Sequence, residues 1–318
     1  MGELTWLGDW SVGAVRQVLS ISAPALADAG IVLSGGVDDG NPEWSAGSAV
    51  VGGSFLAKFA LAEPTARRLW HEARVLAALG GRPELRLPEV VAASDRPVHL
   101  VLVLATGGPL SFPMVAAATG PQVALIAEQL AGFLAALHHP AALAAVGAAL
   151  GAVGVPDPGP QATTSELRTR LARWIRPGQA GQVRSWCDWA DHVLADTGSA
   201  VFVHGDLHGY NQVWDQHGHE LRLVVDWETS GTAEAEYDFR YVPALGPATG
   251  LLTAAADAYT RLTGQPVRLD HVMAWHVRTA LGDALWRSEA GIPLPGGGTP
   301  AGYVDELAAR FDALQLGP

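Results

Sequence analysis

The chain of 318 residues contains a single cysteine, Cys187, and a single lysine, Lys58. One cysteine cannot form an intramolecular disulfide, and the absence of disulfides is typical of proteins in a reducing cytoplasm. The N-terminus lacks the basic start and the long apolar run of a secretory signal. We therefore expect a cytoplasmic protein.

Charged residues are also scarce, at 16%, and acidic residues outnumber basic ones by 32 to 20, giving a formal net charge of −12. A negative surface repels a phosphate backbone, so nucleic acid is not an expected partner, whereas a cationic small molecule is compatible with it. The most apolar stretch, residues 115–155, is broken by glycines, prolines and Glu128. It predicts buried helices rather than a membrane span. We expect no membrane partner, and a monomer or a homodimer.

Apolar residues make up 49% of the chain, enough for a sizeable core, and the length suggests two domains. Residues 98–104 form a nearly continuous apolar run that predicts a buried strand, followed by the breakers of residues 105–109. We expect an N-terminal nucleotide-binding lobe over residues 1–104, a hinge over 105–110 and a C-terminal lobe over 111–318.

Periodicity and capping residues predict several individual elements. A helix should follow Asp9 or Ser11, and a second should run from the Glu63-Pro64 pair to Leu79. Residues 122–138 form an amphipathic helix. Residues 200–203 and 221–226, with the turn at 216–219, predict a compact β-rich insert.

Lys58 stands out because the other 19 basic residues are arginine. It lies in the strand-like apolar segment 50–60, where a charged group is costly without a partner. A compact ammonium on a flexible stem also differs chemically from a guanidinium. We therefore interpret Lys58 as a functional residue.

The clearest chemical signal is residues 201–211, VFVHGDLHGYN, followed by residues 223–228, LVVDWE. Each begins as an apolar strand and then presents an acidic residue, Asp206 or Asp226. Phosphoryl transfer needs a carboxylate that orients the attacking hydroxyl and hard oxygen ligands for Mg²⁺ on the phosphates. The pattern supplies such groups and predicts a phosphotransferase.

These segments resemble the catalytic loop of the aminoglycoside phosphotransferase family, in which His-Gly-Asp-x-x-x-x-Asn precedes a strand ending in a metal-binding aspartate. The resemblance implies an α+β, bilobal protein-kinase-like fold with a small β-rich N-lobe and a larger, mainly helical C-lobe. It further implies that Asp206 is the catalytic base and that Asn211 and Asp226 bind Mg²⁺.

Three neighbouring residues also take their expected roles from the resemblance. His204 would brace the catalytic loop, and Asp238 would support the same loop by hydrogen bonding. His208 would contact the γ-phosphate of ATP or, alternatively, would simply be exposed.

The same resemblance explains the lone lysine, because the family pairs a strand lysine on the α- and β-phosphates with a helix glutamate. Glu72 is the expected partner of Lys58, in preference to Glu63, which suits the helix N-terminus. The remaining nucleotide contacts would come from backbone groups: Gly35 and Gly36 in the glycine-rich loop 34–41, and Leu104 and Thr106 in the hinge. ATP is the expected donor, and the sequence leaves GTP open.

The acceptor is expected to be a hydroxylated small molecule, first of all an aminoglycoside or another antibiotic, so that the enzyme would serve resistance or self-protection. Acidic side chains after the metal site, Glu228, Glu234 and Glu236, could bind its amines, and Trp286 could line its pocket. A metabolite kinase acting on a sugar, an amino alcohol or a nucleoside is the alternative.

Two other classes fit less well. Asp238 follows Asp226 by only twelve positions, too few for the regulated activation loop of a protein kinase, and the glycine-rich loop lacks Gly-x-Gly-x-x-Gly. A catalytically inactive nucleotide-binding module usually loses the lysine, the base or a metal ligand, and this chain retains all of them.

Overall fold

The computed structural model describes residues 4–37, 45–158, 162–196, 198–215, 217, 219–246, 250–294 and 298–316. The chain forms two compact units, each assembled from separate stretches. Unit 1 comprises Met1–Pro109, His139–Pro156 and Asn211–Ser230, and unit 2 comprises Leu110–His138, Asp157–Tyr210 and Gly231–Pro318. The sequence predicts each lobe as one continuous stretch, residues 1–104 and 111–318, whereas each unit combines three stretches of the chain.

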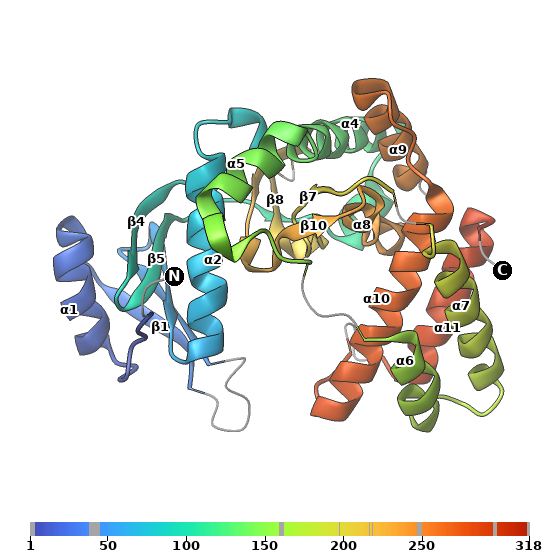
Figure 1. Ribbon diagram of the computed structural model, residues 1–318, viewed down its shortest axis with the longest axis horizontal. Coiled ribbons are helices and arrows are strands. Elements are labelled where there is room, and N and C mark those ends of the chain that lie inside the picture. Colours follow the sequence, from blue (N-terminus) through green and yellow to red (C-terminus); the bar gives the residue numbers. More distant parts are fainter. Residues whose placement is uncertain are drawn as a thin grey trace. The chain divides into compact units, whose positions relative to one another are not determined.

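Unit 1 is built on a five-stranded antiparallel sheet with the order β1-β2-β3-β5-β4 (Figure 1). Its strands are β1 (Ile31–Gly36), β2 (Ala46–Val51), β3 (Phe55–Ala60), β4 (Val90–Asp95) and β5 (Val98–Val103). Successive side chains of a strand point to opposite faces, so β3 directs Ala57 and Phe59 to one face and Lys58 to the other.

In Figure 1 one helix lies on each side of this sheet, α1 (Val12–Ser22) on one side and α2 (Glu63–Leu79) on the other. Helix α1 begins at Ser11, whose hydroxyl accepts the N–H of Ala14, and packs in one apolar cluster with Ala57 and Phe59. Helix α2 contacts β3, β4 and β5, and it has the bounds predicted from its proline start and glycine stop. The face of β3 that carries Lys58 is therefore the face toward α2.

Later parts of the chain complete unit 1. Helix α5 (Pro140–Leu150) packs on α2, and a small sheet combines β6 (Gly108–Pro109), β8 (Gln212–Asp215) and β9 (Glu220–Val224). These contacts explain why the units are discontinuous in sequence. The expected single β-rich insert is wrong in its pairing, because β9 pairs with β8, whereas β7 (Val201–Val203) pairs with β10 (Gly231–Ala233) in unit 2.

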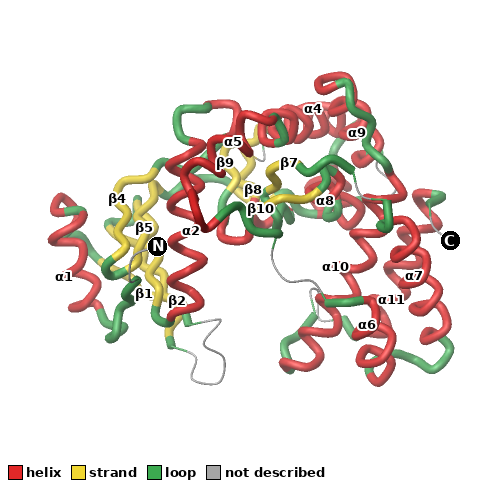
Figure 2. Tube along the Cα trace, in the orientation of Figure 1, coloured by secondary structure: helices red, strands yellow, loops and turns green. Residues whose placement is uncertain are grey.

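Unit 2 is mostly helical, as Figure 2 shows, with β7 and β10 as its short sheet. Its main apolar cluster is formed by residues of α6 (Thr164–Arg170), α7 (Gln179–Val193), α10 (Leu269–Ala290) and α11 (Pro300–Leu314). The short helices α3 (Phe112–Ala117) and α8 (Glu236–Phe239) and the longer pair α4 (Gly120–Leu137) and α9 (Leu251–Thr263) complete the unit.

Within the described residues, α4 is the one helix long and apolar enough to cross a membrane. It packs along α9, and eight of its residues are buried. The buried set, which includes Val123, Leu130 and Leu137, recurs at helical spacing. This is the pattern of a core helix, and it agrees with the amphipathic helix predicted for residues 122–138.

Candidate active site

The only lysine lies at the centre of a charged cluster in unit 1. Lys58 Nζ is 2.7 Å from Glu72 Oε2 and 2.9 Å from Asp226 Oδ1. Glu72 is fully buried, while about a fifth of the Lys58 side chain is exposed. Glu63, the rival partner, instead pairs with Arg67 on the exposed first turn of α2.

Electrostatics keep Lys58 protonated. Burial opposes its charge, but the carboxylates of Glu72 and Asp226 outweigh this effect and raise the pKa of Lys58 above its ordinary value. Two carboxylates thus hold one permanent ammonium on a side chain that is about one-fifth exposed. Such a fixed cation is suited to binding phosphate oxygens.

Helix α2 is anchored so that Glu72 faces the segment that follows β9. Glu72 Oε1 accepts the backbone N–H of Trp227 at 3.4 Å, and His71 Nε2 lies 2.9 Å from Ser230 Oγ. Trp227 is itself fully buried, with its indole N–H donated to the carbonyl of Val224. Two consecutive residues of α2 therefore fix the segment that begins with Asp226.

Asn211 and Asp226 lie at the same end of the β8–β9 hairpin. Gln212 pairs with Val224, and the N–H of Val225 donates to the carbonyl of Asn211 at 2.9 Å. Asp226 adopts a left-handed backbone conformation, with φ of 68°, which aspartate tolerates better than most residues. The hairpin thus brings together the two residues predicted to bind metal.

This pair fits Mg²⁺, because both side chains carry the hard oxygen donors that the ion prefers and 41% of the Asp226 side chain is exposed. Among the described residues, no group of three or more His, Cys, Asp or Glu side chains is arranged to hold a metal ion. A magnesium site here would therefore draw its other ligands from water and nucleotide phosphates, as is usual for this ion.

Glu228 stands at the edge of the same cluster. Its carboxylate is 3.4 Å from Arg68 Nε, and burial together with the neighbouring Asp226 raises its pKa. The structure thus brings Glu228 close to the charges around Lys58.

The hinge predicted from the sequence borders a cavity of about 830 Å³ in unit 1. Leu104 and Thr106 both line it, together with Asp215, His217 and Arg222 of the β8–β9 hairpin. The N–H of Leu104 is already donated to the carbonyl of Ser54 at 2.8 Å. Within this structure the backbone N–H of Leu104 is thus engaged by the residue that precedes β3, and the predicted contacts of Leu104 and Thr106 with the nucleotide stay predictions.

Gly35 and Gly36 end strand β1, where they pair with Gly47 and Ala46. They are thus strand residues rather than part of a free loop. The following Asp38–Asn41 portion of the glycine-rich segment lies outside the described residues.

In unit 2, the loop after β7 that carries the candidate base Asp206 is held by a buried carboxylate. Asp238, on α8, accepts the backbone N–H groups of His204 at 2.8 Å and Gly205 at 3.0 Å, and His138 Nε2–H donates to its Oδ2 at 3.2 Å. Burial disfavours its charge, but these donors and His138 hold the pKa of Asp238 below its ordinary value. His204 is buried, and its Nδ1 accepts the N–H of Asp206 at 3.2 Å. Asp238 and His204 thus both hydrogen-bond to backbone N–H groups of residues 204–206.

The Asp206 carboxylate has two notable neighbours in unit 2. Tyr241 Oη–H donates to Asp206 Oδ1 at 2.6 Å, and His208 Nε2 lies 3.5 Å from Oδ2. No motif in the sequence had pointed to Tyr241. Its position three residues after Asp238, in the segment EYDFRY, was the available signal.

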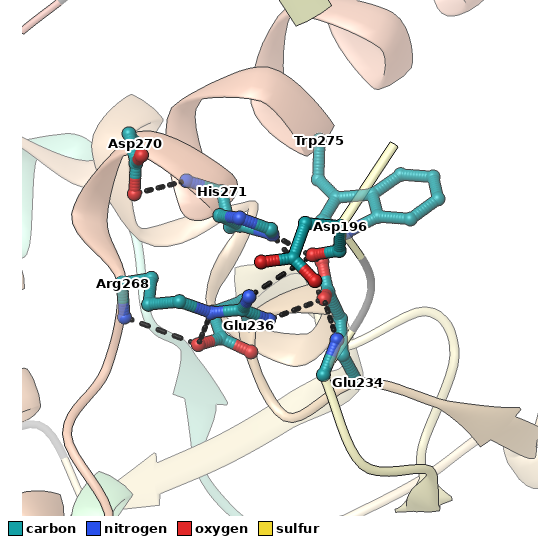
Figure 3. Close-up of polar contacts among 8 residues, drawn as sticks. Asp196, Glu234, Glu236, Arg268, Asp270, His271 and Trp275 are labelled. Carbon is teal, nitrogen blue, oxygen red and sulfur yellow. Dashed lines mark hydrogen bonds and ion pairs between the residues drawn. The ribbon is translucent and has the colours of Figure 1, made fainter. Parts of the chain in front are cut away.

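Glu234 and Glu236 are buried and belong to a tight network shown in Figure 3. Arg268 donates to both carboxylates, through Nη2 to Glu234 at 2.6 Å and through Nε to Glu236 at 3.1 Å. Glu234 also has three further partners: the N–H of Gly198, the indole N–H of Trp275 and His271 Nδ1. Burial opposes its charge, yet these partners hold the pKa of Glu234 low.

The network therefore satisfies both carboxylates within the protein. This leaves them poorly placed to bind the amines of an acceptor, which was their predicted role. Trp286, on α10, is 38% exposed, and its ring lies under the guanidinium of Arg287.

Comparisons with known proteins agree with this geometry. The model of the phosphotransferase enzyme family matches residues 40–281, while a search of curated proteins found no match. Wild-type aminoglycoside 2'-phosphotransferase-IIIa, solved with GDP, is 17% identical, with a TM-score of 0.62 over 94% of this chain and 96% of that chain.

Two further solved structures have the same fold. The streptomycin–ATP complex of APH(2")-IIa is 12% identical, with a TM-score of 0.59 over 96% of this chain and 97% of that one. Macrolide 2'-phosphotransferase MphH from Brachybacterium faecium is 17% identical, with a TM-score of 0.55 over 94% and 98%.

The predicted α+β, protein-kinase-like fold is confirmed by these structures, and the predicted phosphotransferase class is confirmed by the family match. That match extends over more than half of the chain and includes the lysine, the catalytic loop and the segment around Asp226. The chain belongs to the phosphotransferase enzyme family.

Proposed function

We propose that this chain is an ATP- and Mg²⁺-dependent kinase that phosphorylates a hydroxyl group of a small molecule, first of all an aminoglycoside or another antibiotic. The main observation in support of this proposal is the Lys58 ammonium, which is held between Glu72 and Asp226. The nucleotide and antibiotic complexes of structurally similar proteins support it. GTP is the alternative donor.

In this mechanism Lys58 binds the α- and β-phosphates, and Glu72 fixes the direction of its ammonium. Asn211 and Asp226 would hold the metal through their side-chain oxygen atoms. Bound Mg²⁺ supplies positive charge that stabilises the phosphate oxygens. The protein contributes mainly position and charge, because phosphoryl transfer requires little covalent chemistry from the enzyme.

Asp206 acts on the acceptor. Its carboxylate accepts a hydrogen bond from the acceptor hydroxyl and takes up the proton as the new oxygen–phosphorus bond forms. The bond between the γ-phosphorus and the bridging oxygen breaks, and the nucleoside diphosphate leaves. The products are a phosphate monoester and ADP.

We also propose that the enzyme is cytoplasmic and is a monomer or a homodimer. Glu228 and Trp286 are retained as candidate acceptor contacts. Because Glu234 and Glu236 are occupied by Arg268, a strongly cationic acceptor is not required. A metabolite kinase therefore remains the second candidate, and the test should include neutral acceptors.

Incubation of the protein with Mg·ATP and a panel of acceptors tests the reaction. The panel comprises kanamycin, gentamicin, streptomycin, a macrolide, uncharged sugars, amino alcohols and nucleosides, with detection of one added phosphate by mass spectrometry. Phosphorylation of an antibiotic supports the first candidate, and exclusive phosphorylation of a metabolite supports the second. Absence of product and of ADP release throughout would contradict kinase function.

The variant Asp206→Asn tests the mechanism. We expect phosphorylation to fall at least about 100-fold, the lower range for a positioned general base, while ATP binding is retained. Asp257→Asn is the matched control, because it removes an exposed carboxylate on α9 of the same unit. Wild-type turnover by Asp206→Asn would exclude Asp206 as the base.

A further inference from the structure

The hydroxyl of Tyr241 makes a short hydrogen bond to the candidate base. The Oη–Oδ1 distance of 2.6 Å is in the range of charge-assisted O–H···O⁻ bonds, which are about twice as strong as neutral ones. Tyr241 must be the donor, because an ionised carboxylate can only accept. Burial raises the pKa of Tyr241. The charge of Arg240 opposes this effect and the charge of Asp206 adds to it, so the proton stays on the phenol.

This bond fixes one carboxylate oxygen of Asp206 directly. Oδ1 is engaged by Tyr241, while Oδ2 is 3.5 Å from His208 Nε2, beyond a normal hydrogen bond. About a third of the Asp206 side chain is exposed. The bond from Tyr241 therefore sets the direction of a carboxylate that is partly exposed to solvent.

Tyr241 is itself held by a buried cation. The Arg240 guanidinium lies over the rings of Tyr237 at 3.8 Å and Tyr241 at 4.4 Å, and its Nη2 donates to the Gly205 carbonyl at 2.5 Å. Its Nε donates to Thr279 Oγ1 on α10 at 3.1 Å. Arg240 is 1% exposed and therefore has little freedom to move. The position of Tyr241 is thus fixed from the core of unit 2.

We propose that Tyr241 is a positioning residue that, through its hydrogen bond to Oδ1, fixes the direction in which the Asp206 carboxylate meets the acceptor hydroxyl. The inference rests on the proposed role of Asp206 as the base. Tyr241 does not touch the reacting atoms, and Arg240 acts one step further away by fixing the Tyr241 ring. Loss of the hydroxyl should therefore slow the chemical step without weakening nucleotide binding.

The variant Tyr241→Phe tests the role directly, because it removes one oxygen and keeps the ring on which Arg240 lies. Turnover is measured with Mg·ATP in the fastest reaction of the acceptor panel, water alone included as an acceptor. We expect kcat to fall about tenfold, which corresponds to roughly 1.4 kcal/mol, with the KM for ATP unchanged within about twofold. Tyr303→Phe, on α11, is the control for loss of a phenol in the same unit and should keep the wild-type kcat.

A double variant separates positioning from general stabilisation. If Tyr241 acts through Asp206, adding Tyr241→Phe to Asp206→Asn should cause less than about a twofold further loss, because coupled residues are not additive. A full tenfold further loss would show that Tyr241 acts independently of Asp206 and would overturn the proposal.

The outcomes distinguish this inference from the function on which it rests. Wild-type kcat in Tyr241→Phe, with Asp206→Asn inactive, refutes the positioning role alone. Wild-type activity in Asp206→Asn refutes the role of the base and the inference with it. A fall in kcat of Tyr241→Phe that is matched by an equal rise in KM for ATP, or by a large fall in melting temperature, would indicate a structural residue and would also overturn the proposal.

Discussion

The charge of Lys58 is costly to bury, yet it is held in a fixed position. A buried ion pair contributes little net stability, because desolvation offsets most of the attraction, but removing one partner leaves the other charge stranded. Here the stranded group would be Glu72, which is fully buried. Such an arrangement is poorly explained by stability alone, whereas it fixes an ammonium in one place.

The variant Lys58→Met should therefore reduce two properties. We expect unfolding free energy to fall by about 2–4 kcal/mol, because the Glu72 carboxylate loses its cation, and ATP affinity to fall at least about tenfold. Chemical denaturation and calorimetric titration with Mg·ATP measure the two effects.

The double variant Lys58→Met/Glu72→Leu is the control for this prediction. It removes the stranded carboxylate, so stability should recover in large part, but ATP binding should not. Recovery of ATP affinity together with stability would mean that Lys58 does not contact the nucleotide.

At the scale of elements, the catalytic loop depends on α8. One carboxylate, Asp238, accepts two consecutive backbone N–H groups of the loop, from His204 and Gly205. Gly205 has φ of +83°, a conformation that glycine adopts without strain. The loop therefore holds an unusual backbone shape because a buried charge outside it satisfies its donors.

Replacing this carboxylate by an amide, in Asp238→Asn, should loosen the loop. An Asn oxygen can serve one N–H well, but its NH₂ group would face a second donor, so we expect a loss of about 2–3 kcal/mol in unfolding free energy. We also expect at least a tenfold fall in kcat, since a small displacement of a base is costly. Chemical denaturation and steady-state kinetics measure the two losses, with Asp257→Asn as the control at an exposed carboxylate. An unchanged kcat in Asp238→Asn would contradict the prediction.

Gly209 provides a second test of the loop. A Cβ added at Gly209 would overlap the carbonyl oxygen of Leu110, whose N–H donates to the Gly209 carbonyl. Gly209→Ala should therefore reduce the melting temperature and kcat together, because backbone must move. Gly132→Ala, at an open position within α4, should instead raise unfolding free energy by about 0.5–1 kcal/mol. Equal effects of the two variants would contradict the steric argument.

At the scale of the whole molecule, buried histidines make stability depend on pH. Burial lowers the pKa of His71 and His99, and burial together with Arg310 lowers that of His276 to about 3. The Nδ1–H of His276 donates to the Arg240 carbonyl, and its Nε2 accepts from Arg310. Both ring nitrogens are thus engaged in the neutral form.

Acid should therefore destabilise the protein. The unfolded chain protonates His276 near pH 6.5, whereas the folded chain does so near pH 3, so between these values the unfolded state binds more protons. We expect the contribution of this residue to unfolding free energy to fall by about 1.4 kcal/mol for each pH unit below 6.5.

Urea denaturation at pH 7, 6 and 5 measures this dependence. In His276→Gln, the amide can make both hydrogen bonds but does not titrate, so unfolding free energy should fall less between pH 7 and 5 than in the wild type. Identical slopes for the two proteins would refute the assignment.

The sequence was sufficient for the fold class and for the residue types of the site. Helix α2 was bounded by local signals, a proline at its start and glycines at its end. The lone lysine and the spacing of Asp206, Asn211 and Asp226 reflect chemistry that few other residues can perform. Such features are local or chemically specific, so the order of residues alone reveals them.

Only the tertiary structure decided how these elements pair and which charges are already satisfied. The pairing of β7 with β10, and of β6 with β8, depends on contacts between segments distant along the chain. Arg268 neutralises Glu234 and Glu236 from more than thirty residues away, and Tyr241 reaches Asp206 across thirty-five. No local pattern encodes these partners, because a carboxylate has the same sequence signature whether it is free or engaged.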